Sequence, residues 1–126
     1  MFDLRFVVWQ FVRLMVQVED SLKQEKAPDL KRIYDLWEDI WVDLDARLVD
    51  LGRKDGDAFA DLMMNQEVIC EQVTAEDKDT VCGELAKVVD SMTAQLAATD
   101  DAQAVEELSF EREELTLLMK DLKALK

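Results

Sequence analysis

The chain has 126 residues, with 29 acidic and 15 basic side chains, no histidine and a formal net charge of −14. Hydrophobic residues make up 49% of it, which is enough to build the core of one domain and argues against disorder. Two cysteines are too few for a disulfide scaffold, three glycines and one proline are few for an all-β domain, and the acidic balance disfavours direct binding to nucleic acid.

The first predicted helix, over residues 3–26, is apolar on more than one side. A helix that is apolar all round is buried or covered, so this one is either the central helix of a bundle or half of a dimer interface. We predict a homodimer through its second apolar stripe, while packing of the stripe's aromatic residues in the core remains an equal alternative. The stripe consists of Phe2, Phe6, Trp9, Val12 and Val16.

The apolar run at residues 6–18 does not predict a membrane span. A helix needs about 20 apolar residues to cross a bilayer, and Gln10 and Arg13 interrupt this shorter run. The acidic Asp3 is also atypical of a signal peptide, whose N-terminal region is positively charged. We therefore expect a cytoplasmic protein with reduced thiols and no membrane span.

The second predicted helix lies between Pro28, which suits a first helical turn, and Gly52, which suits a helix C-terminus. Its apolar residues follow a strict heptad spacing of four and three, which is the strongest structural signal in the chain. The opposite side of this helix is acidic and is expected to face solvent. The heptad positions are Leu30, Tyr34, Trp37, Trp41, Leu44, Leu48 and Leu51.

Three more helices are predicted in the second half of the chain. Asp57 is expected to cap a helix of about 17 residues, and Thr74 to cap the next one. One continuous helix over residues 57–98 remains the alternative. The segment Thr99-Asp100-Asp101 is expected to open the last helix. Together these elements predict one all-α domain over residues 1–126, an antiparallel bundle of four to five helices with short loops.

The midpoint between Cys70 and Cys82 is residue 76, which lies inside the predicted break at residues 74–77. If the helices on either side form a hairpin, the two thiols lie close together and are able to form a disulfide. Buried free cysteines commonly serve as small hydrophobic residues, so packing is the preferred interpretation in a reducing compartment. Whether the two thiols pair stays open.

The charge is concentrated in the middle of the chain. Residues 35–107 contain twenty acids and five bases, for a net charge of −15. We therefore expect a non-catalytic interaction module, such as an adaptor, a chaperone-like binder or an inhibitor, for a basic protein partner. No catalytic residue, metal or cofactor is predicted. The predicted acidic binding face consists of Asp35, Asp39 and Asp43.

The alternative is an all-α Mg²⁺-dependent enzyme of the nucleotide pyrophosphohydrolase type. Without histidine, catalysis would rely on carboxylates, which are ligands that Mg²⁺ accepts. Acids three or four residues apart share a helix face, so pairs on two facing helices would be able to hold a metal ion. The candidate ligands are Asp35, Glu38, Asp39, Glu67 and Glu71.

Overall fold

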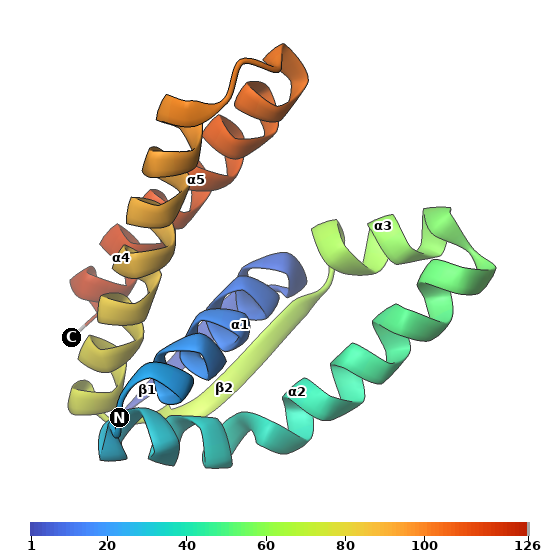
Figure 1. The fold of residues 1–126 in the computed structure, drawn as a ribbon. Coiled ribbons are helices and arrows are strands. Elements are labelled where there is room, and N and C mark those ends of the chain that lie inside the picture. Colours follow the sequence, from blue (N-terminus) through green and yellow to red (C-terminus); the bar gives the residue numbers. More distant parts are fainter. Residues whose placement is uncertain (126) are drawn as a thin grey trace.

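The computed structural model describes residues 1–125, which form five helices and a sheet of two strands (Figure 1). The fold is therefore predominantly helical, as predicted, but it is not purely α-helical. In chain order the elements are β1 (Phe2–Val7), α1 (Val8–Gln24), α2 (Pro28–Lys54), α3 (Gly56–Asn65), β2 (Glu67–Val73), α4 (Ala75–Ala98) and α5 (Ala102–Ala124).

The two strands pair antiparallel although three helices separate them in the sequence. Leu4 lies opposite Cys70 and Phe6 opposite Val68, and all four side chains are buried. The residues between them in each strand are exposed, because successive side chains of a strand point to opposite faces. The sheet therefore contributes one apolar face to the core.

Both strands correct the sequence-based prediction. Residues 3–7 were expected to be helical, but they form strand β1. The predicted helix after Asp57 ends at Asn65 and is followed by strand β2. The alternation of Leu4 and Phe6 with Asp3 and Arg5 is the period-two pattern of a half-buried strand. A two-stranded ribbon is only marginally stable by itself, so its packing against the helices stabilises it.

Helix α1 is central to the molecule. It packs against both strands and against α2, α3 and α4, which explains why it is apolar on several sides. The side chain of Gln10 accepts a hydrogen bond from the backbone N–H of Val7 at 2.9 Å and so stabilises the start of the helix. The rings of Phe6, Phe11 and Trp37 meet with centroids 6.0–6.3 Å apart and join β1, α1 and α2.

Helix α2 confirms the heptad prediction. It begins at Pro28, as expected, and ends at Lys54, two residues beyond Gly52. Leu30, Trp37, Leu44 and Leu48 are buried, and the other heptad positions are half-buried. The seven residues thus form a continuous stripe, which packs first on α1 and then on α3.

The starts of the later helices are also close to prediction. Thr74 accepts a hydrogen bond from the backbone N–H of Asp77, which confirms a break before α4 and excludes the continuous helix over residues 57–98. Asp101 caps α5 through Gln103. Asp55, rather than Asp57, caps α3 by accepting a hydrogen bond from the backbone N–H of Ala58.

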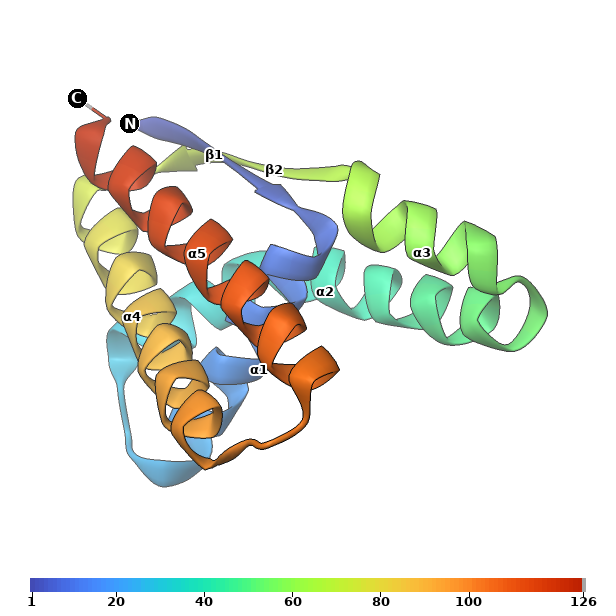
Figure 2. The same cartoon turned by 90° about the horizontal axis from the view of Figure 1, so that it is seen from above.

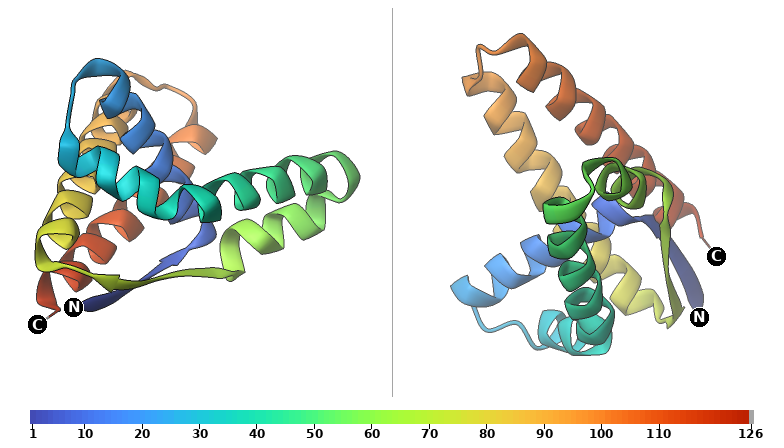
Figure 3. Two further views of the ribbon diagram at one scale, coloured as in Figure 1. Left: turned by 90° about the horizontal axis from the view of Figure 1, so that it is seen from below. Right: turned by 90° about the vertical axis from the view of Figure 1, so that its right-hand side faces the viewer.

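Four of the helices form two antiparallel pairs, α2 with α3 and α4 with α5, and the two pairs point in different directions (Figure 1, Figure 2 and Figure 3). We call residues 49–65, where α2 ends and α3 follows, the α2–α3 arm. Residues 93–114, where α4 ends and α5 begins, are the α4–α5 arm. The rest of residues 1–125 is the body. The predicted antiparallel bundle is not confirmed, because the two arms diverge instead of packing against each other.

The two ends of the chain lie near each other. The buried side chain of Lys78 connects them, since its Nζ donates a hydrogen bond to the carbonyl of Leu125 at 3.1 Å and lies 4.4 Å from the centre of the Phe2 ring. This contact closes the body at the side where β1 begins and α5 ends. Among residues 1–125, no helix is long and apolar enough to cross a membrane.

Candidate functional site

The residues of the predicted dimer stripe do not form one surface. Phe6 is 0% exposed and Trp9 is 6% exposed, so both belong to the core. Phe2 and Val12 are half-buried against that core, and only Val16 is largely exposed. The stripe disappears because β1 replaces the first turn and a half of the predicted helix. The aromatic residues thus follow the core alternative, while a homodimer stays a prediction.

The three side chains of the predicted acidic face lie at the surface of the molecule. Asp35, Asp39 and Asp43 are all exposed, on the side of α2 that points away from the Trp37 core stripe. Asp35 accepts a hydrogen bond from Lys31 at 2.6 Å, and this contact raises the pKa of Lys31. Among residues 1–125, neither Asp39 nor Asp43 forms an ion pair. Their charges are therefore available to a partner.

A shallow hollow of about 240 Å³ adjoins this face, between α2, α3 and β2. Asp43 stands at its edge, next to the partly exposed side chains of Ile40 and Ile69. Arg47 and Glu67 supply charges of both signs at the same edge. The acidic face thus borders a small apolar surface, which gives an approaching partner more than charge to contact.

The alternative metal site does not assemble. Glu67 and Glu71 lie on β2 rather than on a helix, so the second pair of helical carboxylates that the scheme requires does not exist. Glu38 and Asp39 are on α2, and their side chains are exposed. In the part of the chain that the structure describes, no three Asp, Glu, Cys or His side chains are grouped closely enough to hold a metal ion.

The two cysteines are buried and free. Cys70 lies on β2 and Cys82 on α4, so the predicted helical hairpin between them is wrong, and a strand and a helix flank the break instead. Burial raises the pKa of Cys70 to about 12, and burial also raises the pKa of Cys82. Both thiols therefore remain protonated near neutral pH, when they are poor nucleophiles, and their role in this structure is packing.

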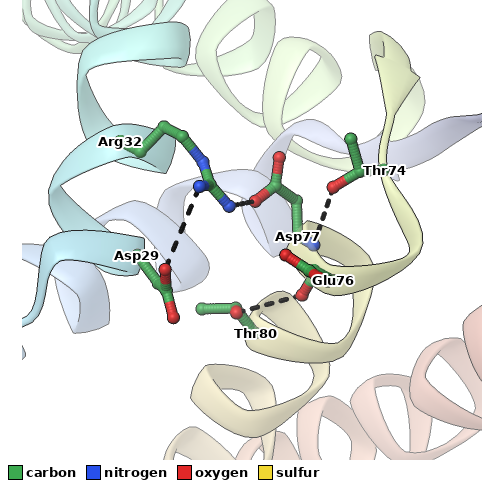
Figure 4. A network of polar contacts seen from close by, with 6 residues as sticks. All are labelled: Asp29, Arg32, Thr74, Glu76, Asp77 and Thr80. Carbon is green, nitrogen blue, oxygen red and sulfur yellow. Dashed lines mark hydrogen bonds and ion pairs between the residues drawn. The ribbon is translucent and has the colours of Figure 1, made fainter.

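Figure 4 shows a polar network where α2 and α4 begin. Arg32 pairs with the buried carboxylate of Asp77 and lies 4.0 Å from Asp29, and the contact with Asp77 raises the pKa of Arg32. Thr74 caps α4 in the same place. Because two carboxylates surround the one guanidinium, this network joins the two helices and leaves little positive charge for an anionic ligand.

A second polar cluster joins α1 to α4. The hydroxyl of Ser21 donates a hydrogen bond to Glu84 at 2.8 Å, and both residues are 4% exposed. Lys87 donates to Glu84 at 3.0 Å and to Ser21 at 3.3 Å. The serine hydroxyl is thus engaged with a carboxylate in the interior, so the cluster serves to hold two helices together.

The arms and α1 enclose a groove that the sequence did not predict. It has a volume of about 330 Å³, and its apolar surface combines Trp9 and residues from both arms. Met64 and Phe110 are each 49% exposed there. Arg13 of α1 and Glu111 of α5 form an ion pair of 3.0 Å across it. The lining residues of this interarm groove are Trp9, Arg13, Met63, Met64, Glu107, Phe110 and Glu111.

Comparison with known protein families, with curated proteins and with solved structures gives no match for this chain. The candidate binding sites of the molecule are therefore two surfaces, the acidic face of α2 and the interarm groove.

Proposed function

We propose that this protein is a non-catalytic interaction module that binds a basic protein partner. The observation that carries the proposal is the exposed row of Asp35, Asp39 and Asp43 on one side of α2. The row lies within residues 35–107, whose net charge is −15. A field of one sign steers an oppositely charged partner and raises its association rate. An adaptor, a chaperone-like binder or an inhibitor would each use such a surface.

The proposal predicts an association that depends on salt. The Debye length is about 8 Å at physiological ionic strength, so the attraction between exposed charges weakens as salt is added. The probe is a polar, basic peptide of lysine and serine, with a fluorescent label. Its association rate, measured by stopped flow, should fall as the ionic strength rises.

Substitution of the acidic face locates the effect. Changing Asp35, Asp39 and Asp43 to Asn should slow association with this peptide by about tenfold at low salt, because the on-rate of charged partners follows the local field. The matched control neutralises three exposed acids elsewhere, with Asp90→Asn, Glu113→Gln and Asp121→Asn. Equal rates and equal salt dependence for wild type and both variants would mean that the acids of α2 serve only solubility.

We also propose the homodimer as a separate property. Val16 is the member of the predicted stripe that remains 46% exposed. Light scattering should give about twice the mass of one chain, and Val16→Glu should shift the protein towards the monomer, because a buried carboxylate without a partner opposes association. A monomer at high micromolar concentration would remove this proposal and leave the binding of a basic partner untouched.

A further inference from the structure

The interarm groove combines large apolar side chains with flexible ones. Trp9 is almost completely covered by its neighbours and Met63 is covered in part, whereas Met64 and Phe110 are half exposed at the two walls. Methionine side chains adapt to differently shaped apolar partners, and aromatic residues often dominate the energy of binding. Neighbouring exposed apolar side chains that form one surface are typical of protein–protein interaction sites.

Phe110 extends the groove along α5. A second hollow, of about 410 Å³, is lined by Gln103, Glu106, Glu107 and Phe110. The two hollows share Phe110 and Glu107. A ligand with apolar side chains at successive helical turns can therefore contact both hollows along α5.

The walls of the groove are acidic. Residues 103–114 of α5 contain five carboxylates and one base, and α3 contains two carboxylates and no base. The base is Arg112, whose side chain donates a hydrogen bond to Thr93 on α4 at 3.5 Å and does not line the groove. Arg13 is already paired with Glu111. Among residues 1–125, no cation forms an ion pair with Glu106 or Glu107.

The groove is lined by helices, and this determines the conformation of its ligand. The backbone groups of α1, α3 and α5 are used within those helices, so an extended peptide would find no strand edge with which to pair. A helix satisfies its own backbone and presents apolar residues at positions i, i+3, i+4 and i+7. Basic residues at its margins would face Glu106 and Glu107 of α5.

We infer that the interarm groove binds a basic amphipathic helix of a partner protein, with its apolar face on Met64 and Phe110 beside Trp9 and its basic margins at Glu106 and Glu107. The inference rests on the proposed function, since it specifies what kind of basic partner is bound and where. A second copy of this chain is a poorer occupant of this groove, because the helices beside the groove are acidic and the chain itself has 29 acidic and only 15 basic side chains.

The test compares two peptides of about five helical turns with equal positive charge. One has leucines at helical spacing and lysines on the other face, and in the second, serines replace the leucines. Titration is followed by the fluorescence of Trp9, with Trp9→Phe identifying its contribution. The leucine–lysine peptide should bind at least about tenfold more tightly than the serine–lysine peptide, since only it has apolar side chains for the two hollows.

Variants of the groove then locate the binding. Phe110→Ser should weaken the binding of the leucine–lysine peptide by about tenfold, as expected for an aromatic residue at the centre of an interface. Leu117→Ser is the matched control, because Leu117 lies on the same helix, is 48% exposed and is outside the groove. Glu106→Gln with Glu107→Gln should weaken binding at low salt and have less effect at high salt.

Each outcome separates this inference from the proposed function. Equal affinities for the two peptides, or equal effects of Phe110→Ser and Leu117→Ser, would overturn the groove and leave a basic partner in place. Failure of both peptides to bind at low salt would overturn the proposed function as well. If Phe110→Ser converts a dimer to a monomer in light scattering, the occupant is a second copy of the chain and the inference is wrong.

Discussion

The helices of the body and the helices of the two arms bury their side chains very differently. In the body, Phe6, Phe11 and Leu14 are completely buried where β1, α1 and α2 meet. Within the arms, residues 49–65 and 93–114, Leu62 is the one buried side chain. Stability should therefore come mainly from the body, so that the arms are free to present the apolar side chains of the interarm groove.

The largest expected difference in stability is between substitutions of two phenylalanines, one in the body and one in an arm. Phe11→Ala removes a ring that is 0% exposed and should lower the free energy of unfolding by about 3–5 kcal/mol. Phe110→Ala removes a ring that is 49% exposed on an arm and should cost less than about 1 kcal/mol. Urea denaturation measures both values. Similar losses for the two variants would show that the α4–α5 arm is as tightly packed as the body.

The pH dependence of stability should reveal the packing of Cys70 in the body. Because the pKa of Cys70 is raised from 9.0 to about 12 by burial, the folded state keeps its proton where the unfolded chain loses it. The contribution of Cys70 to the free energy of unfolding is therefore constant below pH 9. Above pH 9 it should fall by about 1.4 kcal/mol for each pH unit, up to about pH 12. Cys70→Ala should lack this component, and the same slope in both proteins would assign the loss to other groups.

A smaller effect is expected at the polar contact between α1 and α4. Ser21→Ala removes a hydrogen-bond donor from the buried carboxylate of Glu84 and should cost about 1–2 kcal/mol. Ser91→Ala, at an exposed position of α4, should change stability by less than about 0.5 kcal/mol. Thermal unfolding compares the two, and a neutral Ser21→Ala variant would mean that Lys87 alone satisfies the carboxylate.

The smallest effect is expected on the acidic face. The triple change of Asp35, Asp39 and Asp43 to Asn should leave the fold intact, because all three side chains are exposed on the side of α2 away from the core. Circular dichroism and urea denaturation should match those of the wild type. An unfolded variant would mean that this side of α2 is covered, in contrast to its exposure in the structure.

Helix α2 could be predicted in detail because its signals are local. Pro28 is compatible with a first turn, and a strict heptad distinguishes Trp37 and Leu44 from the exposed Asp39. The cap at Thr74 and the start of the last helix near Asp101 were predictable for the same reason, since a cap involves residues only two or three positions away.

The strands could not be predicted with the same ease, because pairing joins residues far apart in the sequence. Phe2, Leu4 and Phe6 alternate with Asp3 and Arg5, but in a helix that is apolar on two sides Leu4 also fits one side and Phe2 and Phe6 fit the other. The low number of glycines and prolines excluded tight turns, yet β1 and β2 need none, because three helices connect them. The alternation was the signal that was overlooked.

The interarm groove could not be predicted from the sequence. It depends on the directions of the two arms, which bring Met64 of α3 and Phe110 of α5 to either side of Trp9. Each of these residues by itself resembles an ordinary position on an amphipathic helix. Only the acidic α2 face, which belongs to a single helix, could be located in advance.

Hydrogen exchange with and without the leucine–lysine peptide tests the division between body and arms most directly. Amide exchange reports the stability of each segment. The peptide should slow exchange in α3 and in residues 103–111 of α5, where the groove lies, and leave the paired strands β1 and β2 unchanged. Slower exchange on the strands instead, or no change in either arm, would contradict the claim that the arms carry the apolar groove that binds this peptide.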